Sequence, residues 1–204
     1  LDFELEHLFE IKNSLEKNKS KCKVIISNKQ ILKVFQDKWL TINYLKKNNF
    51  PFPKTTLASG LKKFLKKNKF PLIVKPRIGS TSKNVFLVKN YYELKEAINK
   101  CNKPIIQEYM YYKDNEYTCG TLMRNNKILS CIVLKRKLKN GNTVKATLEN
   151  NTITKSINKF LINITKKINP DGPLNFQLCF KNDKPYIFEI NPRFSGTTPL
   201  REIF

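Results

Sequence analysis

The sequence predicts a mixed α+β fold in two halves, joined by a hinge near residues 108 to 115. In the first half, short apolar segments of strand character alternate with amphipathic helical patterns. In the second half, long segments of alternating polarity form a meander that precedes a helix and a hairpin. At 204 residues, the chain can bury a sizeable core in one domain or in two small ones.

The first half is expected to mix helices with short strands. Asp37 can accept hydrogen bonds from backbone amides and so cap a helix that begins at Lys38. The prolines at positions 51 and 53 end that helix and favour an extended linker. The predicted helices cover residues 2–17, 28–48 with an interruption at Asp37, 61–67 and 91–99, and the predicted strands cover 23–27, 55–57, 71–74, 85–88 and 104–107.

The second half is expected to be mainly strands. Asn125-Asn126 and Asn140-Gly141 are good hairpin turns, because asparagine and glycine tolerate positive φ. The predicted strands cover residues 116–123, 128–137 and 143–148, a helix covers 153–167, and a final hairpin turns at 181–184.

The composition narrows the classes of partner. The formal net charge of +23 would attract polyanions. The lysines, however, are spread along the chain beside asparagines, and no cluster of arginines and aromatic residues is present. We therefore expect non-specific attraction to polyanions and no dedicated nucleic-acid site.

Cysteine and histidine usage argues against a zinc centre. The five cysteines are scattered, and His7 is the only histidine, so no metal-ligand spacing occurs. Reduced thiols in a cytoplasmic protein are the expected state. No apolar run reaches the length of a membrane span, so no membrane association is expected.

The final hairpin carries the most informative chemistry. Side chains alternate along a strand, so Glu189, Asn191 and Arg193 should share one face. Asn175 and Gln177 should share the matching face of the preceding strand. A carboxylate, amides and a guanidinium suit a hard cation and a phosphate, although a merely solvated polar face is the alternative.

Two further segments carry weaker patterns. Lys75, Arg77, Gly79 and Ser80 lie in a loop between strands, where cations, hydroxyls and amides can face a polyphosphate; a lysine-rich surface hairpin is the alternative. The apolar strand at residues 104–107 ends in a charged hinge, which could hold a purine through backbone groups while Glu116 accepts hydrogen bonds from ribose hydroxyls. Ordinary solvated acids are the alternative there.

Taken in order, these motifs resemble the ATP-grasp superfamily, in its carbamoyl-phosphate-synthetase-like branch. The resemblance runs from about residue 22 to the end of the chain, and its last two motifs are the most specific. The motifs are Asp37-Lys38, Lys75-Pro-Arg-Ile-Gly-Ser80, Gln107-Glu-Tyr109, Glu116-Tyr-Thr118, Asn175-Phe-Gln177 and Glu189-Ile-Asn-Pro-Arg193.

The resemblance implies an ATP-grasp fold in which two α+β subdomains clasp ATP. It divides the chain into a remnant of a preceding α/β domain (residues 1–35), a first subdomain with the phosphate loop (36–108) and a second with the metal-binding hairpin (109–204). It also implies a set of ATP contacts. These are Lys38, Lys75, Arg77, Gly79 and Ser80 for the phosphates, Glu108, Tyr109 and Met110 for adenine, Glu116 for ribose, and Asn175 as a further contact.

The resemblance further implies a magnesium site at Gln177, Glu189 and Asn191, with Glu189 bridging two ions and Mn²⁺ as a possible substitute. Arg193 would neutralise charge that develops during phosphoryl transfer, and Arg136 could close over the phosphates. Thr81 and Asn84 stand where the family usually has further glycines.

The function implied is an ATP-dependent ligase that activates a small carboxylate as an acyl phosphate for attack by an amine or, less often, a thiol. A kinase of a small carboxylate, as in carbamoyl-phosphate synthetase, is one alternative. A non-catalytic module that binds nucleotides or polyanions is another. The expected partners are a small-molecule carboxylate and an amine, and a homodimer is possible.

Overall fold

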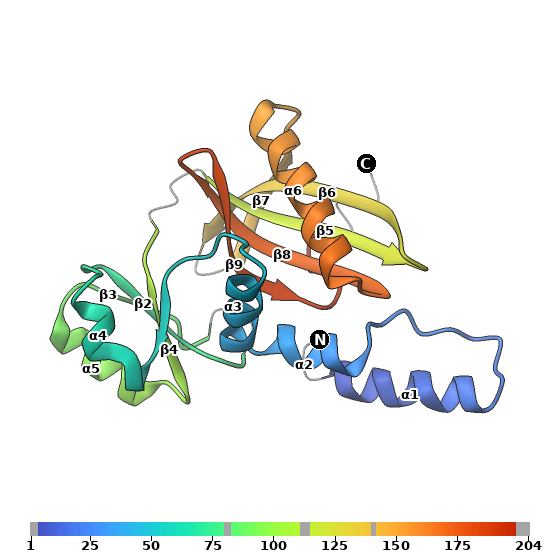
Figure 1. Ribbon diagram of the computed structural model, residues 1–204, viewed down its shortest axis with the longest axis horizontal. Coiled ribbons are helices and arrows are strands. Elements are labelled where there is room, and N and C mark those ends of the chain that lie inside the picture. The colour runs from blue at the N-terminus through green and yellow to red at the C-terminus, as the bar shows by residue number, and fades with distance from the viewer. Residues whose placement is uncertain (1–3, 80–82, 111–114, 140–141, 199–204) are drawn as a thin grey trace.

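The chain folds into two α+β subdomains, each built on an antiparallel sheet (Figure 1). The computed structural model describes residues 4–79, 83–110, 115–139 and 142–198. Its helices are α1 (Leu5–Lys17), α2 (Lys29–Gln36), α3 (Lys38–Lys47), the 3-10 turn η2 (Ala58–Gly60), α4 (Leu61–Leu65), α5 (Tyr91–Lys100) and α6 (Thr152–Ile168). Its strands are β1 (Thr55–Leu57), β2 (Leu72–Pro76), β3 (Phe86–Val88), β4 (Pro104–Glu108), β5 (Glu116–Arg124), β6 (Lys127–Lys139), β7 (Asn142–Leu148), β8 (Gly172–Lys181) and β9 (Lys184–Asn191).

The smaller subdomain contains a four-stranded sheet in the order β1-β4-β2-β3. Leu72 and Val74 of β2 are fully buried in a cluster with Phe64 of α4 and Leu94 of α5. Because side chains alternate along a strand, this packing leaves Lys75 on the opposite face of the sheet. The helices thus cover one face, and the second face is available to a site.

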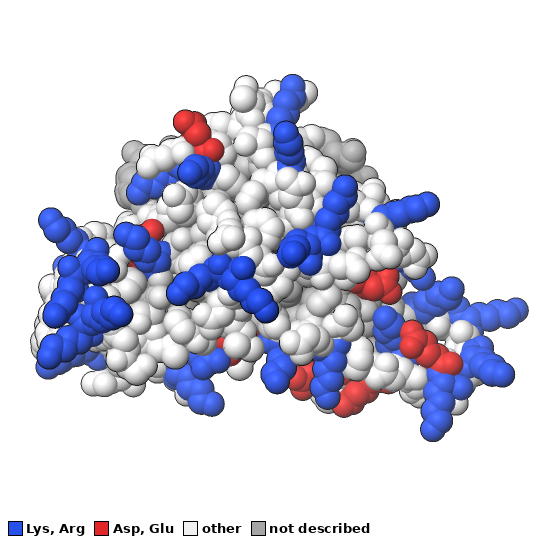
Figure 2. Space-filling model, viewed as in Figure 1, with Lys and Arg blue, Asp and Glu red and all other residues white. Residues whose placement is uncertain are grey.

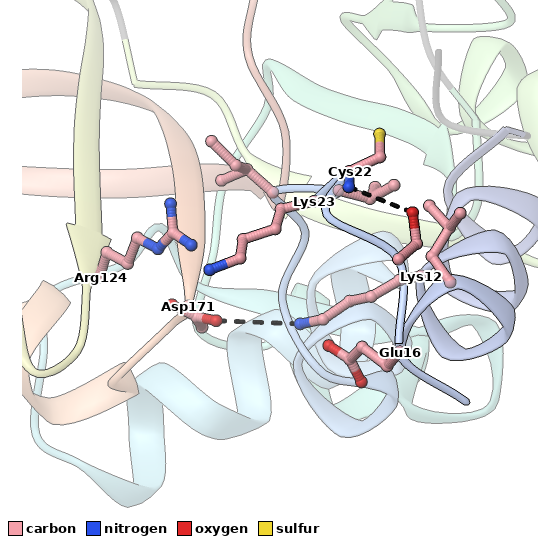
Figure 3. A pocket seen from close by; sticks show the side chains of 10 residues that line it. Lys12, Glu16, Cys22, Lys23, Arg124 and Asp171 are labelled. Atoms are coloured by element: carbon pink, nitrogen blue, oxygen red, sulfur yellow. Dashed lines mark hydrogen bonds and ion pairs between the residues drawn. The ribbon is translucent and has the colours of Figure 1, made fainter. Parts of the chain in front are cut away.

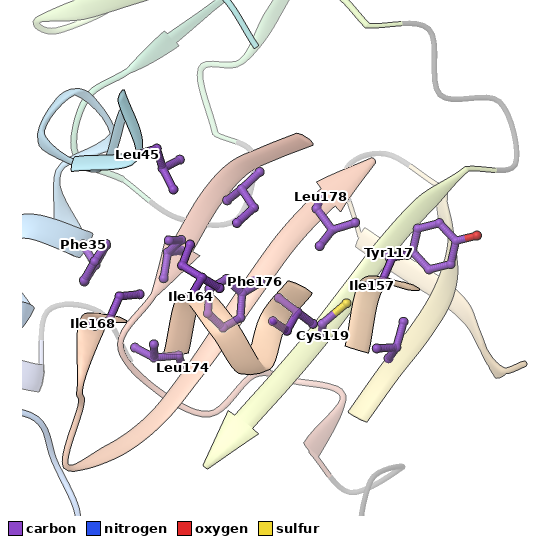
Figure 4. Close-up of a cluster of buried hydrophobic side chains, with 14 of the residues drawn as sticks. Phe35, Leu45, Tyr117, Cys119, Ile157, Ile164, Ile168, Leu174, Phe176 and Leu178 are labelled. Atoms are coloured by element: carbon purple, nitrogen blue, oxygen red, sulfur yellow. The ribbon is translucent and has the colours of Figure 1, made fainter. Parts of the chain in front are cut away.

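The larger subdomain contains a five-stranded sheet in the order β7-β6-β5-β8-β9. Helix α6 packs against one face and contributes Ile157, Leu161 and Ile164 to the main core, where they meet Phe176 and Leu178 of β8 (Figure 4). Helices α2 and α3 lie beside β9 (Figure 1). Their buried side chains, such as Phe35 and Leu45, extend the same core. The other face of the sheet carries the polar residues of β5, β8 and β9.

Most predicted elements are confirmed, with shifts of a few residues at their ends. Asp37 caps α3, as its Oδ1 accepts hydrogen bonds from the amides of Trp39 and Leu40. The Asn125-Asn126 turn is confirmed by positive φ at both residues. The predicted Asn140-Gly141 turn lies outside the described residues.

One predicted element is wrong. Residues 23–27 form no strand; Ile26 and Ser27 are buried, but the segment pairs with no strand of the described chain. Ile26 instead packs with Leu5 and Leu32 in a small cluster. A β-prone sequence becomes a strand only when another strand offers it hydrogen bonds.

On the face of the molecule that Figure 2 shows, Lys and Arg side chains outnumber the Asp and Glu side chains. Lys and Arg side chains are scattered over both subdomains and gather over α4, where Lys62, Lys63 and Lys66 are exposed (Figure 2). In the described part of the chain, no helix combines the length and the apolar character needed to cross a membrane.

Candidate active site

Two lysines and a carboxylate meet where the two subdomains face each other. Lys38 is the first residue of α3, Lys75 comes from β2 and Glu189 comes from β9. The Lys38 Nζ lies 3.7 Å from Glu189 Oε1 and donates to the carbonyl of Gly79 at 2.7 Å. The Lys75 Nζ lies 3.5 Å from the carbonyl oxygen of Phe188. Residues distant in sequence therefore form one charged cluster between the two sheets.

Lys38 is held in place by the start of its own helix. Asp37 caps α3 and also receives the guanidinium of Arg77, whose Nε lies 3.1 Å from both carboxylate oxygens. Burial raises the pKa of Asp37, but the bonds from Arg77 and from two backbone amides outweigh it and leave the pKa below its ordinary value. Arg77 thus has an intramolecular partner, and its predicted contact with phosphate stays a prediction.

Lys75 is the most strongly perturbed charge in the described chain. Only 6% of its surface is exposed, and its Nζ lies 5.6 Å from the centroid of the Phe188 ring. Burial lowers the pKa of Lys75 to about 8; Glu189 and Glu116 counteract this shift, and Lys38 adds to it. A buried ammonium short of anionic partners is well suited to an incoming phosphate.

The β8–β9 hairpin confirms the predicted juxtaposition of four polar residues. Asn175 pairs with Asn191, and Gln177 pairs with Glu189. Directly paired residues project from the same face of a sheet, so an amide pair and an amide–carboxylate pair lie side by side. The amide of Asn175 also accepts a bond from the hydroxyl of Thr118 at 3.2 Å.

These residues offer oxygen donors of the kind that magnesium prefers. Within the described residues, no three His, Cys, Asp or Glu side chains gather as a metal site. The predicted set fits this finding, because it has one carboxylate, Glu189, and the amides of Gln177 and Asn191. The Nδ2 of Asn191 is buried without a partner in the described chain, which shows that protein hydrogen bonds do not saturate this amide.

A β-bulge in β9 was not foreseen. The register shifts between Gln177↔Glu189 and Leu178↔Ile187, so Phe188 is the extra residue. Its ring and carbonyl both lie near the Lys75 ammonium. The sequence did not indicate this bulge. Strict alternation along β9 predicts only that Phe188 and Glu189 point to opposite faces of the sheet.

Arg136 joins two predicted ligand contacts. Its Nε donates to Glu116 Oε1 at 3.1 Å, and its Nη2 donates to Gln177 Oε1 at 3.1 Å and also contacts Glu116. Only 9% of the Arg136 side chain and 16% of the Glu116 side chain are exposed. Strand pairing places Glu116 opposite Cys179 of β8, and Arg136 links its carboxylate to Gln177. The predicted ribose contact of Glu116 stays a prediction.

The end of β4 presents Gln107, and not the expected Glu108, on the face of the small sheet that carries Lys75. Register pairs Glu108 with Leu72, which points into the core of the small subdomain, and pairs Gln107 with Ile73 on the Lys75 face. The predicted adenine contact of Glu108 stays a prediction. Gln107 is buried on the Lys75 face; it was named as part of a motif, but not as a site residue. Met110 is buried beside Cys179 of β8, with 4.0 Å between the sulfur atoms.

Of the remaining predicted residues, Gly79 contacts the charged cluster directly. Gly79 has a φ of 148° and contributes the carbonyl that Lys38 binds, and Asn84 adopts positive φ. Ser80 lies outside the described residues. Arg193 follows the end of β9, and its Nη1 donates to the carbonyl of Phe194. Tyr109 follows β4 directly.

A separate pocket of about 220 Å³ lies at the far end of β5. Lys12, Lys23 and Asp171 point into it, and Arg124 faces them from the last position of β5 (Figure 3). Glu116 is the first residue of the same nine-residue strand, so roughly 25 Å of strand separate this pocket from the cluster around Glu189. Lys12 is already engaged by Asp171 at 3.8 Å and by the carbonyl of Ile26.

Comparison with known proteins identifies the family. Residues 35–197 match the family described as "ATP-grasp domain", and the chain belongs to this family. The chain is 27% identical over 174 residues to the D-alanine–D-alanine ligase of Petrotoga mobilis, covering 77% of this chain and 57% of that protein. It is 32% identical over 117 residues to the glutamate–LysW ligase ArgX of Sulfurisphaera tokodaii, covering 52% of this chain and 41% of that protein.

Solved structures show the same fold. The N5-carboxyaminoimidazole ribonucleotide synthetase of Thermotoga maritima superimposes with a TM-score of 0.70 at 20% identity, over 97% of this chain and 51% of that chain. The D-alanine–D-alanine ligase of Bacillus anthracis gives a TM-score of 0.70 at 20% identity, over 90% of this chain and 64% of that chain. The chain thus spans about half the length of the curated relatives and between half and two thirds of these solved chains. The expected ATP-grasp fold is confirmed, and the branch within the superfamily stays a prediction.

Proposed function

We propose that this chain is the ATP-binding and phosphoryl-transfer part of a Mg²⁺-dependent ligase that joins a small carboxylate to an amine. One observation carries the proposal: Lys38 and Lys75 converge on Glu189 from the other subdomain, beside the amide pair of Asn175 and Asn191. Cations and oxygen ligands that meet across a cleft suit a metal-bound polyphosphate.

In this proposal the two lysines bind the phosphates of ATP. Lys75 gains an anionic partner for its buried ammonium, and Lys38 exchanges its contact with Glu189 for a phosphate oxygen. Gly79 and Ser80 belong to the loop that binds the phosphates. Arg77 holds Asp37, which caps the start of α3. The region from Gln107 to Met110 holds adenine, and Glu116 accepts hydrogen bonds from ribose.

Gln177, Glu189 and Asn191 would hold magnesium, with Glu189 between two ions; Mn²⁺ has the same ligand preferences. When bound, the metal neutralises phosphate charge and makes the γ-phosphorus a better electrophile. Glu189 would turn from Lys38 towards the metal, and Arg193 would stabilise charge on the transferred group. This assignment leaves every charged residue of the cluster with an oppositely charged partner.

The chemistry proceeds in two steps. A carboxylate oxygen of the substrate attacks the γ-phosphorus of ATP, and the bond to the bridging oxygen of ADP breaks. The amine then attacks the carbonyl carbon of the acyl phosphate, phosphate leaves with the electrons of the C–O bond, and the nitrogen loses a proton. The cleft between the sheets would exclude water, which would otherwise hydrolyse the acyl phosphate.

The relatives named above are called ligases of D-alanine with D-alanine and of glutamate with LysW, which supports small carboxylates and an amine as the substrates.

The first test is thermal stabilisation of the protein by ADP. We expect the melting temperature to rise with ADP and Mg²⁺ together and to rise much less with either alone. Glu189→Ala should abolish the magnesium-dependent part, whereas Glu96→Ala, which removes an exposed acid of α5, should retain it. A shift that is independent of magnesium would favour the non-catalytic nucleotide-binding or polyanion-binding module.

The second test distinguishes a ligase from a carboxylate kinase. Hydroxylamine traps an acyl phosphate as a hydroxamate, so a panel of carboxylates with ATP should yield one hydroxamate. For a ligase, ADP release with that carboxylate should then depend on a particular amine. Acyl phosphate formation that no amine accelerates would favour the kinase reading. No trapped product with any carboxylate, in a protein that binds ADP and Mg²⁺, would contradict both enzymatic functions.

A further inference from the structure

We propose that Arg136 is a positioning residue that couples the ribose and metal subsites. This inference rests on the proposed function, because it concerns how Glu116 and Gln177 are held for their ligands. It differs from the expectation that Arg136 closes over the phosphates of ATP. The structure gives its guanidinium two oxygen partners within the large sheet.

The geometry of the sheet makes this contact unusual. Arg136 belongs to β6, its ion-pair partner Glu116 belongs to β5, and Gln177 belongs to β8. The strand order is β6-β5-β8, so the guanidinium reaches across the central strand to the strand beyond it. One side chain thereby bonds to polar groups of two successive neighbours at the face of the sheet opposite α6.

Arginine is well suited to this task. Its guanidinium is planar, permanently charged and carries five N–H donors in a fixed fork, so two acceptors bound by it are fixed relative to each other. The pair is largely shielded from solvent, with 9% of the Arg136 side chain and 16% of the Glu116 side chain exposed. A partly buried ion pair gives little net stability, because desolvation offsets the attraction. Its main effect here is on the orientation of the two acceptors.

For Gln177, the contact selects which end of the amide faces the site. Arg136 can only donate, so its Nη2 requires the oxygen of the Gln177 amide at 3.1 Å. That oxygen has a second lone pair, which stays available to a cation. Without Arg136, the amide can rotate and present its NH₂ group, which cannot bind a metal. Gln177 pairs with Glu189 across β8 and β9, so its orientation bears directly on the proposed magnesium site.

For Glu116, the contact holds one carboxylate oxygen and leaves the other with free lone pairs. Both bonds from Arg136 reach Oε1. The Oε2 atom can therefore accept hydrogen bonds from the ribose hydroxyls while the carboxylate remains ionised and oriented. A single guanidinium thus prepares both subsites.

The test compares two ratios in the full chain. The first is the affinity for ADP relative to 2′-deoxy-ADP, which reports the ribose contact. The second is the Mg²⁺ concentration that gives half of the maximal ADP binding, which reports the metal subsite. Removal of a side chain that orients a metal ligand weakens metal binding by about tenfold or more. We therefore expect Arg136→Met to raise the Mg²⁺ requirement about tenfold and also to bring the ribose ratio close to one.

Variants that alter only one of the two subsites are compared with the Arg136 variants. Glu116→Gln should change mainly the ribose ratio, and Gln177→Leu should change mainly the Mg²⁺ requirement. Lys139→Met, which removes an exposed cation from the same strand, should change neither. Arg136→Lys should fold even if the methionine variant does not. Because the lysine ammonium lacks the planar pair of donors that lets arginine bind two acceptors, Arg136→Lys should return at most one of the two ratios to its wild-type value.

The outcomes separate this inference from the proposed function. The coupling role is overturned if neither Arg136 variant changes either ratio. It is also overturned if Arg136→Met changes only one of the two ratios. ADP binding by the protein stands in both cases. If the unaltered protein shows no magnesium-dependent ADP binding, the proposed function and this inference both fail.

Discussion

At the scale of single residues, Lys75 carries a charge whose burial costs stability in the ligand-free protein. Its ammonium is almost fully buried, with Glu189 and Glu116 only partly offsetting the loss of water. The pKa of Lys75 falls from 10.5 to about 8, so the charged form is disfavoured in the folded protein. A phosphate beside this group would restore the ordinary preference for the charged form.

We predict that Lys75→Met stabilises the ligand-free protein below pH 8. The folded-state pKa lies below the unfolded one, so the unfolded chain binds more protons between pH 8 and 10.5, and wild-type stability rises with pH across that window. A shift of this size corresponds to about 3 kcal/mol. The variant should gain a stability of this order at pH 7, and its advantage should disappear above pH 10.5. Urea denaturation at several pH values measures it, and an equal gain at pH 7 and pH 11 would contradict the explanation.

We also predict that ADP binding is accompanied by proton uptake near pH 8. A phosphate close to Lys75 raises its pKa, so a partly neutral amine takes up a proton when the nucleotide binds. Isothermal titration calorimetry in two buffers of different ionisation enthalpy gives the number of protons. The uptake should be largest between pH 8 and 9 and absent in Lys75→Met. Equal binding enthalpies in both buffers at pH 8.5 would exclude it.

At the scale of elements, the start of α3 determines where Lys38 lies. Asp37 caps the helix through two backbone amides and simultaneously pairs with Arg77 from the end of β2. The Lys38 amide also donates to the carbonyl of Arg77 at 2.9 Å. These contacts fasten the helix terminus to the small sheet and direct Lys38 towards Gly79 and Glu189.

We predict that Asp37→Ala destabilises the protein more than Asp37→Asn. Alanine removes both the cap and the partner of Arg77, for a loss of about 2 kcal/mol, whereas asparagine caps a helix as well as aspartate does. The Asp37→Asn variant should therefore lose only the ion pair, and ADP should bind it more tightly than it binds Asp37→Ala. Urea denaturation and ADP titration measure both effects. Equal losses in the two variants would show that the cap contributes nothing.

Predictability from sequence also differs between elements. The polar face of the β8–β9 hairpin was predictable, because side chains alternate along each strand and polar residues at every second position therefore share a face. The bulge at Phe188 was not, because the alternation of polar and apolar residues carries no signal for an extra residue in one strand. The failed strand at residues 23–27 shows the same limit: local β propensity cannot supply a neighbouring strand.

At the scale of the whole molecule, the two sheets have separate cores. Leu94 belongs to the cluster of the small subdomain, and Leu161 belongs to the main cluster under the large sheet. Contacts that join the two subdomains include those of Lys38 with Glu189 and of Lys75 with the carbonyl of Phe188. A ligand bound by these residues, as proposed above, would strengthen the connection between the subdomains.

We predict that large-to-small substitutions loosen the two cores separately. Leu94→Ala and Leu161→Ala remove fully buried side chains, and each should cost about 3 kcal/mol. Hydrogen exchange followed by mass spectrometry should show faster exchange mainly in the small subdomain for Leu94→Ala and mainly in the large one for Leu161→Ala. Leu129→Ala, at a position that is 59% exposed, is the control. Uniform acceleration over both halves in each variant would show a single cooperative unit.

A second whole-molecule prediction follows from the net charge of +23. Self-repulsion of this size destabilises the compact state, and salt screens it over about 10 Å at 0.1 M ionic strength. The melting temperature should therefore rise between 10 and 150 mM sodium chloride. A melting temperature that is flat or falls over this range would show that the repulsion is already balanced by local ion pairs.

Periodicity and spacing along the chain were enough to predict most helices and strands, the polar face of the final hairpin and the family resemblance, but not the absence of a strand at residues 23–27. Which candidate residues meet became visible only in the folded chain. In the structure, Arg77 pairs with Asp37, and Arg136 contacts Glu116 and Gln177. Gln107, and not Glu108, lies on the face of the small sheet that carries Lys75. The physical reason is that ion pairs and strand register depend on neighbours distant in sequence, which composition and spacing do not specify.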